Sequence, residues 1–186
     1  GKNRNFFRTR LVENVRRALG DMEVLKIQSV AHRLVLSLGE GTDPGQVAER
    51  LHRVMGIAYF ASVHRSSTEL ESIRRQAWEV LARKKFSSFA VRVKTAGSKF
   101  PMKSMELERD LGAVILKHLS QEGRREVKVN LSSPEITCRV EIIPGGALIY
   151  TERLEGCGGL PAATGGRLLC LLSGGFDSAV AAYKMM

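Results

Sequence analysis

Residues 87–95, SSFAVRVKT, decide the architecture of the middle of the chain. The run is rich in aromatic and β-branched residues, which predicts a strand. Residues 104–120 follow with the apolar period of a helix, and a second amphipathic helix is predicted over residues 67–84. Three more short strands are predicted over EVKVNL (126–131), ITCRVEII (136–143) and GALIY (146–150). We therefore expect two helices packed on a sheet of about four strands.

The first 65 residues predict a smaller unit. It opens with an Arg-rich amphipathic helix over residues 1–19, and Asp43 before Pro44 marks the start of a second helix. Its strands are predicted over MEVLKIQ (22–28), HRLVLSL (32–38) and IAYFASVHR (57–65). This order is that of a ferredoxin-like unit without its first strand. Because the chain starts on Gly1 and enters a helix at once, we expect it to begin within a longer protein.

The chain is strongly basic, with 29 Lys and Arg residues against 19 Asp and Glu and a formal net charge of +10. Excess positive charge concentrates polyanions, of which nucleic acid is the commonest large one. The three cysteines have no CxxC spacing, and the sequence has no signal peptide. We therefore expect a cytoplasmic protein in a reducing environment, without structural zinc. No apolar run approaches the length of a membrane span, so we expect no membrane insertion.

Residues 151–167 are rich in glycine and have no periodicity, which indicates a linker. The stretch LLCLLSGGFDSAV (168–180) follows it and reads as a buried parallel strand over Leu168–Leu172, a glycine turn and a helix. Such a turn presents backbone N–H groups and the positive end of a helix to a phosphate. No Lys follows the glycines, so the loop is not of the Walker A type. The two serine hydroxyls would donate hydrogen bonds, and Asp177 would act at a metal, on the pyrophosphate side or as a helix cap.

These motifs resemble those of known families. SGGFDS resembles the PP-loop of the ATP pyrophosphatases, which adenylate a carbonyl oxygen and release pyrophosphate. FAVRVKTAGSKFP with SMELERDLGAVI, VNLSSPEITCRVEI and ALIY resembles a THUMP domain, an RNA-binding module of tRNA-modifying enzymes. GCGGLPAATGGRLLCLLSGGFDSAVAAYKMM resembles the domain junction of the tRNA 4-thiouridine synthetases, the ThiI family, and GKNRNFF resembles the start of that family's ferredoxin-like domain.

The resemblance covers essentially the whole chain and implies an α/β (α+β) fold class. It implies a ferredoxin-like domain without its first strand over residues 1–64 and a THUMP domain over residues 65–154. A linker over residues 155–167 would lead into the strand-loop-helix start of a doubly wound α/β PP-loop domain over residues 168–186, where it is truncated.

The resemblance also implies an enzyme that binds tRNA near its acceptor stem. The enzyme would use ATP and Mg²⁺ to adenylate the uridine at position eight, and a persulfide donor such as a cysteine desulfurase would supply sulfur for 4-thiouridine. The fragment alone is expected to be inactive without the rest of the PP-loop domain. The family implies a link to the thiazole of thiamine, and a homodimer is among the assemblies that it allows.

The resemblance, together with the loop and the basic positions, implies a set of site residues. Asp177 is the expected catalytic residue, and the expected nucleotide-binding residues are Leu171, Leu172, Ser173, Gly174, Gly175, Asp177 and Ser178. The expected RNA contacts are Lys2, Arg4, Arg8, Arg92, Lys94, Lys99 and Lys103, which would hold phosphates without reading sequence.

Other functions stay open at the level of sequence. The chain could be a non-catalytic THUMP-type tRNA-binding module that ends in a phosphate-loop-like turn. It could instead be part of a PP-loop ligase or amidotransferase for a small metabolite, which predicts no dependence on tRNA. A different tRNA base modification on the same architecture is a third alternative.

Overall fold

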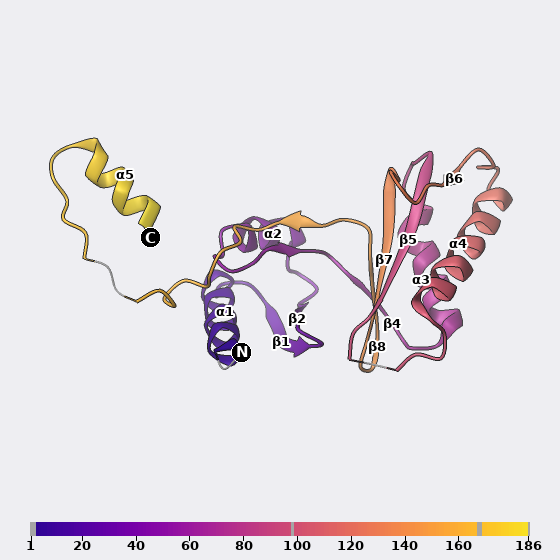
Figure 1. Cartoon of the computed structure of the whole chain (residues 1–186), viewed down its shortest axis with the longest axis horizontal. Coiled ribbons are helices and arrows are strands. Elements are labelled where there is room, and N and C mark those ends of the chain that lie inside the picture. Colours follow the sequence, from indigo (N-terminus) through magenta and orange to yellow (C-terminus); the bar gives the residue numbers. More distant parts are fainter. Residues whose placement is uncertain (1–2, 98, 167–168, 186) are drawn as a thin grey trace. The chain divides into compact units, whose positions relative to one another are not determined.

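The computed structural model describes residues 3–97, 99–166 and 169–185, which form two compact units (Figure 1). The first unit is built from Gly1–Ile27, Leu36–Phe60 and Leu154–Met186, and the second from Gln28–Val35 and Ala61–Arg153. In chain order the elements are α1 (Arg4–Ala18), β1 (Val24–Val30), β2 (Arg33–Leu38), α2 (Pro44–His52), β3 (Tyr59–Phe60), β4 (His64–Ser66), α3 (Leu70–Ala82), β5 (Ser88–Thr95), α4 (Ser104–Gln121), β6 (Lys128–Val129), β7 (Ile136–Ile143), β8 (Gly146–Tyr150), β9 (Leu154–Glu155) and α5 (Phe176–Met185).

The second unit is a five-stranded sheet with two helices on one side. The strand order is β4-β8-β7-β5-β6, in which β5 runs parallel to β6 and β7 and β8 runs antiparallel to β7 and β4. Helices α3 and α4 both cover the same side of this sheet (Figure 1). The prediction of two helices on a sheet is therefore confirmed, with one strand more than expected.

The extra strand comes from a segment that we predicted to be one continuous strand. Residues 57–65 contain β3, which pairs with β9, and the first residues of β4, which pairs with β8 in the five-stranded sheet. The prediction of a single strand is wrong because the apolar pattern shows which residues favour a strand but not which partner each half pairs with.

The core of the second unit lies between the sheet and the two helices. Phe89, Val91 and Val93 of β5 point to this side, where Leu111 and Ile115 of α4 are fully buried. Because successive side chains of a strand point to opposite faces, Arg92 and Lys94 lie on the other face. The alternation within β5 thus separates the core from a basic surface.

The first unit has the predicted order of helix, hairpin, helix and strand. Asp43 caps α2 as expected, because its Oδ1 accepts a hydrogen bond from the N–H of Gly45 at 2.9 Å, with Pro44 at the first helical position. The buried core of this unit consists of Val15, Leu19, Val47, Leu51 and Val54.

Residues 154–162, within the segment that we predicted to be a linker, form a strap on the first unit. Strand β9 pairs with β3, the Gly56 N–H donates to the carbonyl of Gly158 at 2.7 Å, and Asn14 donates to the carbonyl of Ala162 at 3.1 Å. Gly56 has a φ of +97°, and a Cβ there would lie 2.9 Å from Cγ of the buried Pro161. The close packing and the positive φ both require glycine at this position.

The strand that we predicted before the phosphate loop is not formed. Leu168 lies outside the described residues, and residues 169–172 have no strand assignment. Leu169, Leu171 and Leu172 are exposed rather than buried. The prediction is wrong here because an apolar run becomes a buried strand only where neighbouring strands pair with it, and none of the described strands does so.

Among the described helices, none combines the length and the apolar character that a membrane crossing requires.

Changing Leu111 to Ala should destabilise the second unit by about 2–5 kcal/mol, because it leaves a cavity in a fully buried part of α4. Urea unfolding monitored by the fluorescence of Trp78, the only tryptophan, measures the change, since Trp78 packs against this core. The exposed Leu116 of the same helix is the matched control, and Leu116→Ala should cost about 0.5 kcal/mol or less. Equal effects of the two changes would contradict this description of the core.

Candidate nucleic-acid interface and phosphate loop

The sheet side opposite α3 and α4 carries a group of basic side chains that we call the cationic face. Strand register places Arg92 beside Arg139, Lys94 beside Glu141, and Arg65 beside Leu148 on this side. Glu141 is the only acidic residue among the strand positions on this face. The basic members of the cationic face are Arg65, Arg92, Lys94, Lys128 and Arg139.

Arg92 and Arg139 are held in place by main-chain carbonyls. Arg92 donates to the carbonyl of Leu131 at 2.6 Å, and Arg139 donates to the carbonyls of Thr151 at 3.1 Å and Thr137 at 3.5 Å. Two like charges side by side on neighbouring strands disfavour the sheet. A pair of oriented guanidiniums that repel each other is, however, well suited to bind the oxygens of a phosphate.

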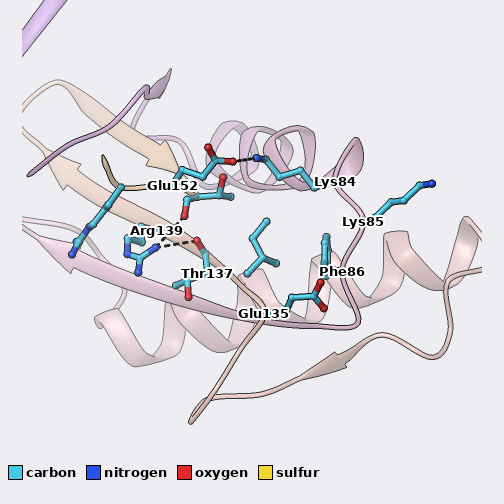
Figure 2. Close-up of a pocket in the computed structure, with 10 residues that line it drawn as sticks. Lys84, Lys85, Phe86, Glu135, Thr137, Arg139 and Glu152 are labelled. Carbon is cyan, nitrogen blue, oxygen red and sulfur yellow. Dashed lines mark hydrogen bonds and ion pairs between the residues drawn. The ribbon is translucent and has the colours of Figure 1, made fainter. Parts of the chain in front are cut away.

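A hollow of about 580 Å³ lies next to the cationic face (Figure 2). Arg139 extends into it from β7, while Lys84 and Lys85 come from the segment after α3 and Arg153 from the segment after β8. Lys84 forms an ion pair with Glu152 at its edge. The remaining lining residues are Phe86, Glu135, Ile136, Thr137 and Thr151. The hollow therefore continues the basic surface, with four cations against two carboxylates.

The structure places only two of the predicted RNA contacts on this face, namely Arg92 and Lys94. Lys99 and Lys103 are exposed and lie between β5 and the start of α4, where Glu106 accepts a hydrogen bond from the N–H of Lys103 at 3.1 Å. Lys2 lies outside the described residues. Contact with RNA by any of these residues stays a prediction.

Arg4 and Arg8 belong to the first unit and lie one turn apart on α1. Both are exposed, and the first turn of α1 contains no acidic residue. Cations at a helix N-terminus are disfavoured by the helix dipole. Arg4 and Arg8 have no ion-pair partner among the described residues, so an external anion would offset this repulsion.

Several basic residues of this surface were not among the predicted RNA contacts, including Arg65, Arg139 and Arg153. A signal was present for Arg139, because in ITCRVEII it alternates with the apolar residues that face the core. No such signal existed for Arg65 or Arg153, because their place depends on which strands pair and where β8 ends.

Hydrogen bonds that involve Ser173 and Ser178 hold the predicted phosphate loop together. Ser178 Oγ accepts a hydrogen bond from the N–H of Ser173 at 3.1 Å and donates to the carbonyl of Gly175 at 2.9 Å, while Gly175 donates to Ser173 Oγ at 3.3 Å. Asp177 is exposed in the first turn of α5. Paired hydroxyls, a glycine turn and a helix start are the donor set that fits a nucleotide phosphate. Leu171, Leu172 and Gly174 are exposed next to it.

The structure contains no candidate metal site in the described part of the chain. No group of three or more His, Cys, Asp or Glu side chains that could hold a metal ion occurs there. Cys138 is fully buried in the core, where burial raises the pKa of its thiol to about 12 although Arg139 acts in the opposite direction. Cys157 and Cys170 are exposed.

Comparison with protein families matches the chain in three consecutive segments. Residues 1–61 match the ThiI ferredoxin-like domain, residues 67–152 the THUMP domain, and residues 163–186 the thiamine biosynthesis protein ThiI. The chain belongs to the ThiI family. The resemblance proposed from the sequence is confirmed, and so is the mixed α/β fold class with its ferredoxin-like and THUMP domains. The strand predicted before the phosphate loop is the exception.

Relatives of this ThiI-family chain are named as probable tRNA sulfurtransferases. The Thermus thermophilus relative is 38% identical over 186 residues, which is all of this chain and 44% of the relative. The Coxiella burnetii relative is 38% identical over 192 residues, again covering all of this chain and 47% of the relative. The chain thus spans about half the length of the curated relatives that it matches.

Two solved structures are similar to the ThiI-family chain. A crystal structure from Pyrococcus horikoshii has a TM-score of 0.83 and 29% identity, covering 98% of this chain and 61% of the other. A 4-thiouridine synthetase in complex with RNA and with bound ATP has a TM-score of 0.79 and 31% identity, covering 99% of this chain and 46% of the other.

Cys138 should resist alkylation in the folded ThiI-family chain, whereas Cys157 and Cys170 react. The thiolate is the nucleophile, and at pH 8 a thiol with a pKa near 12 is almost entirely protonated as well as covered by the core. Mass spectrometry after brief treatment with iodoacetamide should find two modified cysteines in native protein and three in urea. Modification of Cys138 at the rate of the other two in native protein would contradict its burial.

Proposed function

We propose that this chain provides the tRNA-binding part and the phosphate loop of a tRNA sulfurtransferase that makes 4-thiouridine. The observation that carries the proposal is the cationic face, where fixed guanidiniums of Arg92 and Arg139 lie side by side without an acidic residue between them. A surface of this kind suits a polyanion better than a small uncharged metabolite. The names of the relatives and the RNA-bound synthetase support tRNA as that polyanion.

Recognition through the cationic face would depend on the backbone and shape of the tRNA. Lysine and arginine contacts to phosphates provide affinity and orientation but carry no sequence information. Double-helical RNA is recognised mainly by shape, because its deep major groove excludes side chains. We therefore propose that the acceptor stem is selected by the spacing of its phosphates against the basic residues.

The chemistry would take place at the phosphate loop, with the rest of the PP-loop domain completing the site. ATP would transfer its adenylyl group to O4 of the uridine at position eight, with release of pyrophosphate. The terminal sulfur of a persulfide donor would then attack C4 and displace AMP, and a second thiol of the donor would cleave the S–S bond, which leaves 4-thiouridine and a disulfide. Ser173, Ser178 and the N–H groups at the start of α5 would hold phosphate oxygens. Asp177 would hold Mg²⁺, which would neutralise the charge of the phosphates.

Changing Lys94 to Ala should weaken tRNA binding and make it less sensitive to salt. Lys94 is exposed on the cationic face, so its loss should remove one phosphate contact and lower the slope of log K against log salt by about 0.7–0.9. Filter binding at several salt concentrations measures both quantities. Lys117→Ala, at an exposed position of α4, changes the same charge on the helical side and should leave affinity and slope nearly unchanged. If Lys94→Ala and Lys117→Ala had the same affinity and the same salt slope, the proposal that the cationic face binds tRNA would be contradicted.

Changing Asp177 to Ala should abolish formation of 4-thiouridine while leaving tRNA binding intact. The complete protein that contains this chain would be incubated with unmodified tRNA, ATP, Mg²⁺ and sulfide, and the digested RNA analysed by mass spectrometry. Tyr183→Ala, at an exposed position of the same helix, is the control and should retain product. If wild-type protein binds tRNA but gives no product, a non-catalytic tRNA-binding module becomes the better account.

A further inference from the structure

The cationic face contains one acidic side chain that its proposed function does not explain. Glu141 lies on β7 and is 4% exposed, and it is the only buried charged residue in the described part of the chain. Its register neighbour on β5 is Lys94. A carboxylate in a surface that binds phosphates repels them, and burial of a charge is costly unless the charge is paired.

The carboxylate of Glu141 is fully engaged by two neighbours. Arg33 donates to it through Nε at 3.0 Å and Nη2 at 3.4 Å, one hydrogen bond to each carboxylate oxygen. Tyr150 donates its hydroxyl hydrogen at 2.8 Å. Burial alone would raise the pKa of Glu141, but the hydrogen bonds from Arg33 and Tyr150 outweigh it and lower the pKa, so the group is ionised at neutral pH.

A second arginine is connected to Glu141 through Tyr150. Arg153 donates from Nη2 to the Tyr150 hydroxyl at 3.2 Å, and its guanidinium carbon lies 5.8 Å from the centre of the Tyr150 ring. Arg153 also lines the hollow beside Arg139. One carboxylate therefore fixes the position of two guanidiniums, one directly and one through a tyrosine.

The unusual backbone conformation just before Arg33 indicates that the fold holds this residue at a defined position. Ala31 and His32, the two residues between β1 and β2, have φ values of 46° and 67°. A two-residue hairpin turn of this kind favours Gly or Asn, and other residues adopt positive φ only at a cost in free energy. The tip of the hairpin, residues 28–35, groups with the second unit, where Arg33 meets Glu141.

We propose that Glu141 is a positioning residue of the RNA-binding surface. It holds Arg33 directly and Arg153 through Tyr150, so that their charges stand at fixed places next to Lys94 and Arg139 before tRNA arrives. This inference rests on the proposed tRNA-binding function and adds the reason for an acid within a basic surface. Side chains that are already ordered lose less entropy when they bind, which strengthens binding without adding any interaction.

Changing Glu141 to Gln distinguishes this role from a purely electrostatic effect, because the two predict opposite changes in tRNA affinity. Coulomb attraction alone predicts tighter tRNA binding when a negative charge leaves a basic surface. Loss of positioning predicts weaker binding, by about fivefold or more if both arginines become disordered. It also predicts that the slope of log K against log salt falls by about 0.7–0.9 for each phosphate that the variant no longer binds, although the net charge has increased.

Two further variants complete the test with the 186-residue chain and tRNA as the probe. Glu79→Gln removes an exposed acid from α3 and should leave binding unchanged or slightly tighter. Tyr150→Phe keeps the charge of Glu141 but breaks the link to Arg153, and should weaken binding by about two- to threefold. Trp78 fluorescence shows whether each variant is folded, and if Glu141→Gln is not, Tyr150→Phe decides the question.

The outcomes separate the two proposals. Wild-type chain that fails to bind tRNA even at low salt would overturn the proposed function together with this inference. Wild-type chain that binds, with a folded Glu141→Gln variant that binds equally well or more tightly, would overturn the positioning role and leave the tRNA-binding function standing. Weaker binding with a reduced salt slope, and no such change in Glu79→Gln, supports the role of Glu141.

Discussion

The period of two along β5 and β7 is the constraint on which the second unit depends. One set of alternate residues, such as Val91 and Val140, forms the core with α3 and α4, and the other set, such as Arg92 and Arg139, forms the cationic face. A shift of either strand by one residue would place guanidiniums in the core and valines in water. The stability of the unit therefore fixes the spacing of its cations, so that folding and the proposed recognition of tRNA have one cause.

The cationic face combines a high positive charge with fixed positions for several of its charged groups. A net charge of +10 would attract RNA from any direction. Guanidiniums held by main-chain carbonyls, as in Arg92 and Arg139, or by a carboxylate, as in Arg33, are attached to defined points of the sheet. Glu141 holds neighbouring arginines in position, and its negative charge weakens the attraction of the surface for RNA. This arrangement is consistent with recognition of RNA by its shape.

Much of this fold could be predicted from the sequence, because periodicity is strong in α3, α4 and β5. The short strands could not be predicted to the same degree: the division of residues 57–65 between β3 and β4 depends on partners that lie far away in the chain. The same holds for the site. Arg92 and Lys94 follow from the pattern of one strand, whereas the network of Arg33, Glu141 and Arg153 joins residues from three separate segments that only the folded chain brings together.

The strap has a consequence for synthesis on the ribosome. Strand β9 and the segment up to Ala162 complete the first unit, yet they follow the whole of Ala61–Arg153 in the chain. Strand β3 and Gly56 therefore emerge from the exit tunnel long before their partners and remain unpaired while the second unit is being made. The second unit can fold as soon as it has been translated, but the first unit reaches its final form only after the strap arrives. The first unit thus begins earlier in the chain than the second, but it is the later of the two to be completely translated.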